Sequence, residues 1–591
     1  MVSDYLLTAL ILTLTDGLAA VGLTLLAGFA GQVSLGHMAF AGIGAYTSAI
    51  LSARFGLNPW LAMLPATAIT GLAAALVGAP LLRLRGHYLA LGTLGLGLVI
   101  SSAMKELTGL TGGPSGFAGI PRLALFGHPL STLEYFGVTA LMALGAGWLL
   151  TRLVRSRTGR LLQATRDSEI GAEMTGIDAR RLKLQIFTLS AVLAALSGSL
   201  YVHFVTFISP GPFEMLNSLK LLVIATLGGM RSIPGAWIGA GALTLLMELV
   251  RDVVPRLLPN AGGEQQMITY GLLMVLVLVY LPDGITGAAA RLVARFRSKA
   301  RRPQLDRAPS SPAASPAAIW ESLRPARLQP LEVSRVAVSF GGFAAVRDVS
   351  FTAAPGEVTA IIGPNGAGKT TLFNLICGLV HPTAGEIRWG GRSLRGLSPN
   401  RLARLGLGRT FQNIRLFTHM TALENVMVGV EAAHGPGVLA SMLRFPQVVR
   451  AEAQTAARAR ELLAVVGLAG EASTKVSHLP FGKQRMLELA RALAIRPHLL
   501  LLDEPASGLT SQEERDALVA VIRSIREAGI SVILVDHDMR FVMSLADRVV
   551  VLAGGQRIAE GTPDRVQSDP NVIQAYLGEA ASASEGGTPL T

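Results

Sequence analysis

The chain has 591 residues; half are apolar, only 15% are charged, and the formal net charge is +13. This composition excludes a disordered chain, and a charged share below the roughly 25% of soluble domains does not fit a wholly soluble protein. The halves differ, because 34 of the first 300 residues are charged and 57 of the remaining 291. Their net charges, +8 and +5, are too small to favour nucleic-acid binding. The single cysteine, Cys377, excludes an internal disulfide.

Long apolar runs fill the amino-terminal half. A membrane-spanning helix needs about 20 mostly apolar residues, which gives roughly eight candidate spans before residue 285. Glycines lie inside several of these runs, where they allow helices to pack closely. Residues 1–300 are therefore predicted to form an all-α, multi-pass membrane domain with broken helices. The clearest runs are 6–29, 61–82, 88–104, 135–150, 184–207 and 268–281.

Clusters of basic residues predict the orientation of this domain, because cytoplasmic loops carry an excess of lysine and arginine. Three clusters are expected on the cytoplasmic side: 83–85, 152–183 and 291–302. The segment 105–134 then faces outside. The same reasoning predicts a helical hairpin over 219–250 that places Arg231 at its inner tip.

Glycine clusters interrupt the predicted helices at 28–36 and 228–235. Broken helices inside a membrane are tolerated in packed protein or beside a water-filled path. Gln32, Ser34 and His37 lie at the first interruption and are candidates for lining a path for a polar solute. Satisfying the broken helix ends is an equally consistent role.

A segment rich in proline, alanine and serine, 301–328, separates the two halves. It shows no apolar period, so we expect a semi-extended cytoplasmic tether without a core of its own. A second domain is expected over 329–579, followed by a flexible tail, 580–591.

The second domain carries a sequence typical of phosphate binding. Residues 363–370 read GPNGAGKT, which fits G-x-x-x-x-G-K-[ST], between a predicted strand at 358–362 and a predicted helix at 371–379. Lys369 is expected to reach the β- and γ-phosphates of a nucleotide, and Thr370 to bind Mg²⁺. Backbone N–H groups of the loop and the helix N-terminus favour the phosphates. The predicted nucleotide-binding residues are Gly363, Pro364, Asn365, Gly366, Ala367, Gly368, Lys369, Thr370 and Thr371.

Two acidic residues follow another predicted strand. The sequence LLLLDEP at 499–505 brings Asp503 and Glu504 to the carboxyl end of a strand, where α/β sheets bind nucleotides. Asp503 is expected to hold Mg²⁺, directly or through water, and Glu504 to polarise the attacking water. A helix cap is the alternative role for these acids. His537 follows the predicted strand 531–535 and is expected at the same sheet edge.

Two weaker signals lie between these motifs. Gln412 is a candidate for contacting Mg²⁺ or water, although a lone glutamine also fits an exposed surface. LPFGKQR at 479–485 precedes a predicted helix at 486–495. The glycine turn and the helix N-terminus are suited to face another phosphate.

The order of these motifs resembles that of ABC-transporter ATPases over 329–579. The resemblance implies an α/β P-loop ATPase in which Glu504 is the catalytic base, His537 the switch histidine and Gln412 the sensor of the membrane domain. It also implies that Phe340 stacks on adenine. A partner ATPase's nucleotide is then expected to contact Leu479, Phe481, Gly482 and Lys483.

Two positions depart from the pattern of that family. Residues 479–483 read LPFGK where LSGGQ is usual, and Thr510 stands where aspartate is common. Both positions belong to the contribution made to the partner's nucleotide. The chain's own phosphate loop is therefore expected to be intact, and the partner's nucleotide to be held less typically.

Further motifs resemble importers of branched-chain amino acids. LPFG and the segment 561–579 resemble their ATPases, whereas 28–46 and 159–177 resemble their membrane subunit. The resemblance implies that a permease and an ATPase, usually separate subunits, are fused here. The charged segment 159–177 is then expected to couple the two domains through Arg166, Asp167 and Glu169. A solvated loop is the alternative.

The resemblance implies ATP-driven import across the inner membrane by alternating access, with ATP and Mg²⁺ as cofactors. The expected cargo is a branched-chain or related aliphatic amino acid, with urea or other amides as the alternative. Expected partners are a second permease subunit, a second ATPase subunit, a periplasmic or lipid-anchored solute-binding protein and membrane lipid, or else a second copy of the chain. The short, glycine-broken spans argue against an exporter. A non-hydrolysing regulator is disfavoured by the presence of Lys369, Asp503, Glu504 and His537.

Overall fold

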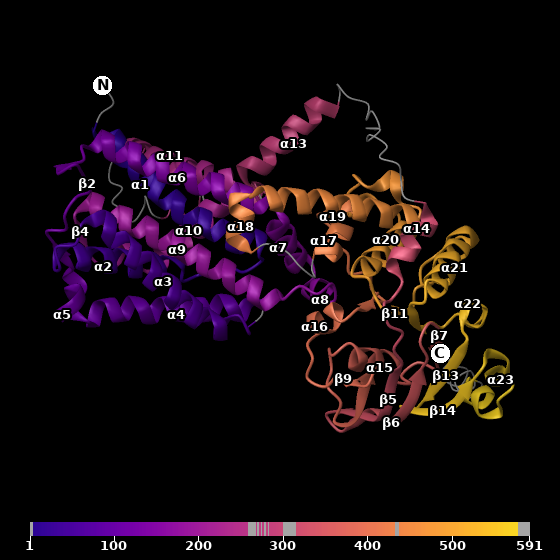
Figure 1. Ribbon diagram of the computed structural model, residues 1–591. Coiled ribbons are helices and arrows are strands. Elements are labelled where there is room, and N and C mark those ends of the chain that lie inside the picture. Colours follow the sequence, from indigo (N-terminus) through magenta and orange to yellow (C-terminus); the bar gives the residue numbers. More distant parts are fainter. Residues whose placement is uncertain are drawn as a thin grey trace, which may run out of the picture. The chain divides into compact units, whose positions relative to one another are not determined.

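The computed structural model describes residues 4–84, 86–257, 283–298, 315–431 and 437–576, together with short pieces between 268 and 281. The chain divides into two units (Figure 1). The first comprises Met1–Leu162, Arg180–Arg307 and Val438–Leu443, and the second Gln163–Ala179, Ala308–Gly437 and Arg444–Thr591. The predicted tail, Arg85, most of the run 268–281 and the first half of the tether lie outside the described residues.

Helices dominate the first unit, as expected for a chain that must satisfy its backbone hydrogen bonds within a membrane. Six of them, within the described residues, are long and apolar enough to cross a membrane. Two more, of 17 and 14 residues, are shorter, so the expected count of about eight spans stays a prediction. The main helices are α1 (Asp4–Leu23) with a π-helical continuation (Thr24–Phe29), α2 (His37–Ala53), α3 (Pro59–Leu81), α4 (His87–Glu106), α6 (Thr132–Val154), α9 (Ala179–Val205), α10 (Met215–Gly228), α11 (Ile233–Leu257) and α13 (Gly284–Ser298).

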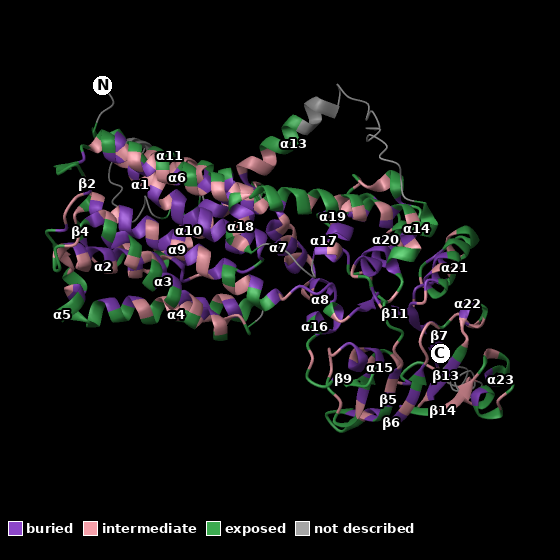
Figure 2. Cartoon of the chain, in the orientation of Figure 1, coloured by how far each residue is buried: buried purple, intermediate pink, exposed green. Residues whose placement is uncertain are grey.

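Burial separates the inner helices of this unit from its apolar outer surface (Figure 2). The apolar stretch of α9 is 72% buried, against 22% for that of α4. Leu64, Leu72 and Leu76 of α3 are all more than half exposed. Exposed leucines in such numbers are suited to lipid, which is as apolar as their own side chains.

Both predicted helix interruptions are present. Residues 30–36 separate the π-helical turn from α2, and residues 229–232 separate α10 from α11. The latter two helices pack closely, because a Cβ added to Gly239 would lie 2.1 Å from the carbonyl oxygen of Ile224. The structure therefore contains the predicted helical hairpin, and the side that Arg231 faces stays a prediction.

A close approach between α2 and α9 gives a first test of the packing. A Cβ added to Gly198 would lie 2.0 Å from the carbonyl oxygen of Ala41, closer than such atoms approach. Gly198→Ala is therefore expected to destabilise the helix pair by about 1–3 kcal/mol or more, because the two backbones must separate. The measurement is the yield and thermal stability of the full-length chain in detergent. Gly241→Ala is the matched control, because nothing lies within 4 Å of its added Cβ; equal stability of both variants would contradict the close approach.

Two sheets form the framework of the second unit. One has six strands in the order β10–β11–β12–β7–β13–β14, parallel except for the pairing of β13 with β14. The other is antiparallel, in the order β6–β5–β8–β9. The strands are β5 (Leu331–Phe340), β6 (Phe343–Ala353), β7 (Val358–Ile362), β8 (Ala384–Trp389), β9 (Arg392–Ser393), β10 (Leu407–Arg409), β11 (Leu499–Asp503), β12 (Ser531–Val535), β13 (Arg548–Ala553) and β14 (Gln556–Gly561).

The central strands β7, β11 and β12 are buried along their whole length, as expected for a parallel sheet covered on both faces. The principal helices around the sheets are α15 (Lys369–Ile376), α16 (Pro399–Arg404), α17 (Ala422–Glu431), α19 (Pro446–Val465), α20 (Phe481–Ala494), α21 (Gln512–Glu527), α22 (Met539–Leu545) and α23 (Pro563–Gln567). The predicted strands at 358–362 and 531–535 are confirmed.

The prediction of an extended tether is wrong for part of 301–328. Residues Pro316–Leu323 form helix α14, which begins with a serine cap, Ser315, and a proline in the first turn. Ile319 and Leu323, one turn apart, are 3% and 2% exposed and belong to the core of the second unit. A single apolar turn is too short to show a period in the sequence.

Candidate functional site

The phosphate-binding loop joins β7 to α15. An added Cβ on Gly363 or Gly368 would lie 2.0 or 2.5 Å from a backbone carbonyl oxygen, so both glycines are required for the loop to close. The Lys369 ammonium donates hydrogen bonds to the carbonyl oxygens of Gly363 and Pro364, at 2.6 and 2.8 Å. It therefore lies over the loop, where phosphate would bind. The other predicted loop residues, Asn365, Gly366, Ala367, Thr370 and Thr371, lie in this loop and the first turn of α15.

The acidic pair lies at the carboxyl end of β11, which is between β10 and β12, and β7 follows β12 in the same sheet. Asp503 is 2% exposed, and burial raises the pKa of its carboxyl group, although the Arg409 guanidinium opposes the shift. Glu504 has a φ of +46° and donates its backbone N–H to the Val535 carbonyl at 2.7 Å. His537 Nδ1 lies 3.7 Å from Glu504 Oε2. The structure thus brings together the three predicted residues.

A magnesium site fits these side chains. Asp503 Oδ1 is buried and has no hydrogen-bond partner among the residues that the structure describes, which suits an oxygen that would face a hydrated cation. Thr370 would supply the hydroxyl ligand. When bound, the ion supplies positive charge that neutralises the phosphate oxygens. Gln412 is exposed, and its contact with Mg²⁺ stays a prediction.

Two residues of this site were missed in the sequence. Arg409, on β10, binds Asp503 Oδ2 at 3.0 Å and Asn374 Oδ1 at 2.8 Å with a side chain only 3% exposed. Asp536, after β12, accepts the backbone N–H of Ala506 at 3.1 Å and is 1% exposed. Asp536 was detectable as a charge directly after the predicted strand 531–535, whereas Arg409 lies on a three-residue strand that the sequence did not predict.

A buried ion cluster connects helix α20 to the loop around Gln412. Glu488, fully buried, lies 3.2 Å from Arg485 and 3.9 Å from Arg491. Arg485 donates hydrogen bonds to the carbonyl oxygens of Phe411 and Gln412. Glu488 accepts the backbone N–H of Arg415 at 3.1 Å. The Gln412 loop is therefore held to α20, the helix that begins within the signature sequence.

The signature residues occupy the start of α20, which begins at Phe481, five residues before the predicted start at 486. Pro480 is the residue before the helix, a position where the missing N–H of proline costs nothing. Leu479 is buried and Phe481 is 46% exposed. Lys483 pairs with Glu471 at 2.5 Å. A Cβ on Gly482 would lie 2.1 Å from the Glu514 carboxylate, whose other oxygen accepts the Thr510 backbone N–H at 3.2 Å.

Phe340, the residue expected to stack on adenine, lies at the end of β5 opposite Phe343. Both rings are at least half exposed. An exposed aromatic pair is available for stacking. Its contact with adenine stays a prediction.

The predicted coupling segment belongs to the second unit from Gln163 onward, at the end of α7 (Arg157–Asp167) and in α8 (Glu169–Glu173). Asp167 Oδ2 accepts the backbone N–H of His419 at 3.3 Å, and Arg404 donates to the carbonyl oxygen of Gly176 at 2.9 Å. Met174 is 3% exposed in the core of this unit. The segment therefore packs on the ATPase domain rather than forming a solvated loop. Arg166 and Glu169 lie in the same segment.

Asp167→Ala tests the coupling role. Loss of its hydrogen bonds to the backbone and ring of His419 is expected to lower solute uptake roughly fivefold to thirtyfold, because each of the two bonds contributes up to about 1 kcal/mol. ATP hydrolysis is expected to change less. The measurement compares uptake and phosphate release in proteoliposomes, with the exposed Asp564→Ala as control. A parallel fall of both activities would contradict coupling through Asp167.

The predicted path residues of the membrane domain are buried. Gln32, Ser34 and His37 are 4%, 1% and 1% exposed, and His37 Nε2 lies 3.4 Å from Ser190 Oγ. None of them is among the residues that line the cavity of this unit described below. Their role in permeation stays a prediction.

Fold, phosphate loop and acidic pair together define an ATP-binding cassette that follows a membrane domain. Family models agree: "ABC transporter" matches residues 346–507, and "Branched-chain amino acid transport system / permease component" matches residues 5–278. A third, "Branched-chain amino acid ATP-binding cassette transporter", matches residues 556–582. The chain is an ABC transporter in which permease and ATPase are fused, and its ATPase domain binds nucleotide and hydrolyses ATP.

Relatives specify the family. The high-affinity branched-chain amino acid transport ATP-binding protein BraF of Pseudomonas aeruginosa is 44% identical over 252 residues, 42% of this chain and 98% of the relative. LivG of Escherichia coli, with the same description, is 41% identical over the same shares. A solved ATP-binding cassette in its ADP conformation is 29% identical over 43% of this chain and 100% of its own, with a TM-score of 0.37. The chain belongs to the branched-chain amino acid transport family of ABC transporters.

Proposed function

We propose that this chain imports branched-chain amino acids across the inner membrane, with its ATPase domain in the cytoplasm. The observation that carries the proposal is the complete hydrolytic site, Lys369, Asp503, Glu504 and His537, in one chain with a permease domain of this family. The relatives BraF and LivG, which are described as branched-chain amino acid transport ATP-binding proteins, support the cargo.

Hydrolysis follows from the roles of the site's side chains. Lys369 binds the β- and γ-phosphates, and the Glu504 carboxylate orients and polarises a water for attack on the γ-phosphate. His537, 3.7 Å from that carboxylate, positions it. The signature residues of a second ATPase close over the nucleotide, and this closure drives the coupling segments, opening the path outward. Hydrolysis then resets the inward-facing state.

Assembly is part of the proposal. A second permease subunit, a second ATPase subunit and a periplasmic or lipid-anchored solute-binding protein complete the transporter. The altered signature at Pro480, Phe481 and Lys483 and the threonine at 510 support an asymmetric pair of nucleotide sites, which two different ATPases would supply.

Reconstitution tests the proposal. The full-length chain, with its partner subunits and binding protein in proteoliposomes, is expected to take up leucine only with ATP and Mg²⁺. Uptake of another solute in place of leucine would contradict the proposed cargo but not the proposal of ATP-driven import. Full uptake by the chain without a second ATPase would overturn the asymmetric assembly.

A further inference from the structure

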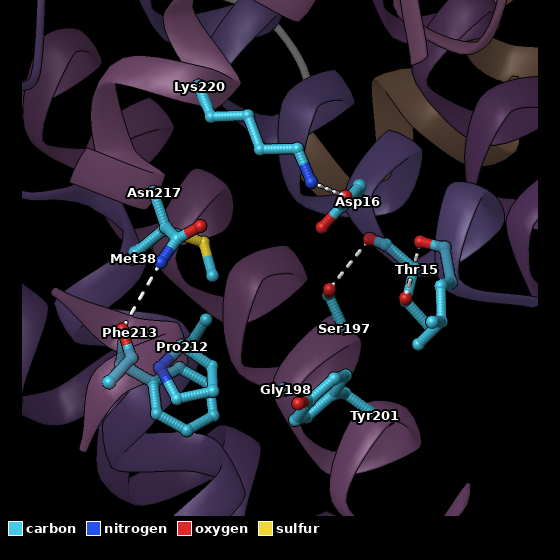
Figure 3. A pocket seen from close by; sticks show the side chains of 13 residues that line it. Thr15, Asp16, Met38, Ser197, Gly198, Tyr201, Pro212, Phe213, Asn217 and Lys220 are labelled. Atoms are coloured by element: carbon cyan, nitrogen blue, oxygen red, sulfur yellow. Dashed lines mark hydrogen bonds and ion pairs between the residues drawn. The ribbon is translucent and has the colours of Figure 1, made fainter. Parts of the chain in front are cut away.

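A cavity of about 410 Å³ lies among the helices of the membrane domain (Figure 3). Its volume is within the roughly 300–1,000 Å³ of small-molecule sites. Helices α1, α2, α9 and α10 and a 3₁₀ turn (Gly211–Phe213) all contribute to the lining. These segments are far apart in the sequence, so the cavity is a product of the fold.

An ion pair supplies the charge of the cavity lining. Asp16 of α1 and Lys220 of α10 are both lining residues, and Lys220 Nζ lies 2.6 Å from Asp16 Oδ2. Each side chain remains 30% exposed. Ionisable groups within membrane helices are costly, face the protein interior or a water-filled cavity, and mark substrate pathways. The pair is therefore accessible to a solute that enters the cavity.

The remaining lining is mixed. Thr15 and Ser197 are tied to each other, because Ser197 Oγ donates to the Thr15 carbonyl oxygen at 2.7 Å. Asn217 Nδ2 donates to the carbonyl oxygen of Gly211 at 3.2 Å. Apolar surface comes from Met38, Ala41, Tyr201 and Phe213. The cavity thus offers one positive group, one negative group and an apolar wall.

We infer that this cavity binds an α-amino acid zwitterion, with the ammonium on Asp16, the carboxylate on Lys220 and an aliphatic side chain against Met38 and Phe213. A zwitterion inserted between the two side chains gives each a new partner of opposite charge. A plain amine would leave Lys220 unpaired and a plain carboxylic acid would leave Asp16 unpaired, which is unfavourable for ionisable groups among membrane helices. The exchange of partners therefore selects for ligands that carry both charges.

This inference deepens the proposed function, on which it rests, by naming the permease residues that recognise the cargo. It explains how the membrane domain would hold an amino acid after the binding protein has released it. The competing hypothesis is that the ion pair only joins α1 to α10 and does not recognise the cargo.

Equilibrium binding of radiolabelled leucine to the purified full-length chain in nanodiscs tests the site. The wild type is expected to bind leucine, and isoamylamine and 4-methylpentanoate, which lack one charge each, to compete at least about tenfold more weakly. Asp16→Asn and Lys220→Met are each expected to weaken leucine binding at least about tenfold. Arg291→Met is the matched control, because Arg291 forms a 2.7 Å ion pair with Asp283 and neither residue lines the cavity.

A charge exchange separates recognition from structure. Asp16→Lys combined with Lys220→Asp keeps an ion pair but reverses its polarity against the apolar wall, and it is expected to fold without recovering leucine binding. Recovery by this double variant, unchanged binding by the single variants, or no leucine binding by the wild type would each overturn the site. Leucine binding without ATP-driven uptake would overturn the proposed function and leave the site. Uptake that is equal in wild type and single variants would overturn the site alone.

Discussion

Glu504→Gln is expected to lower ATP hydrolysis by about 10²–10⁴-fold, the usual contribution of a positioned general base. The carboxylate stands at the carboxyl end of β11, 20% exposed and 3.7 Å from His537 Nδ1. An amide of the same shape keeps the packing but cannot accept a proton from the attacking water. ATP binding is expected to persist, because Lys369 and the phosphate loop are unchanged. Phosphate release by the purified full-length chain and nucleotide binding under the same conditions measure both effects.

Glu513→Gln is the matched control for Glu504→Gln. Glu513 is exposed in the first turn of α21. Its substitution replaces the same carboxylate by the same amide outside the hydrolytic site. It is expected to leave hydrolysis at the wild-type rate. Hydrolysis by Glu504→Gln at that rate would remove Glu504 from the mechanism. Leucine uptake that survives in Glu504→Gln would show that transport does not depend on hydrolysis at this site.

Local sequence was sufficient to predict the hydrolytic site. The phosphate loop and the acidic pair each follow a short apolar run, and in a parallel sheet such runs end at one edge. The structure accordingly brings Glu504 within 3.7 Å of His537 although 33 residues separate them. The residues of the hydrolytic site lie in the turns that follow strands. Predicting the strands was therefore enough to predict which residues come together in the site.

Pairings between distant helices could not be predicted in this way. Asp16 and Lys220 are 204 residues apart, and each alone is a polar residue in an apolar run. Only helix packing brings them to one cavity. The glycine breaks correctly predicted interrupted helices, and the residues beside the first break, Gln32, Ser34 and His37, are buried and are not among the residues that line the cavity. A glycine break in packed protein and a glycine break beside a water-filled path look alike in the sequence.

The signature region illustrates a second limit. The glycine in LPFGKQR suggested a turn, whereas the structure begins α20 at Phe481 and places Gly482 inside its first turn. Proline before the helix sets its start, and the missing Cβ makes room for the Glu514 carboxylate. The glycine serves a packing contact across the fold, which local turn propensities do not contain.

Glu488→Ala is expected to destabilise the ATPase domain by about 3–5 kcal/mol, because it leaves buried guanidinium groups without their counter-charge. Glu488 is fully buried, 3.2 Å from Arg485 and 3.9 Å from Arg491. Burial lowers the pKa of Arg491 to about 10, although Glu488 opposes that shift. Glu488→Gln is expected to be less harmful, since it keeps an oxygen for the Arg415 N–H. The measurement is the temperature at which the full-length chain in detergent loses ATP hydrolysis.

The burial of Glu488, rather than the loss of an ion pair as such, is expected to determine how much Glu488→Ala destabilises the domain. Glu471→Ala breaks the 2.5 Å pair with Lys483 near the start of α20, but a pair that is partly open to solvent contributes less than about 1 kcal/mol. Its inactivation temperature is therefore expected to stay close to that of the wild type. Glu488 also holds the loop that contains Gln412, through Arg485 and the Arg415 backbone. Glu488→Ala is thus expected to weaken the dependence of hydrolysis on the membrane domain even below the inactivation temperature, and equal inactivation temperatures for Glu488→Ala and Glu471→Ala would contradict the buried cluster.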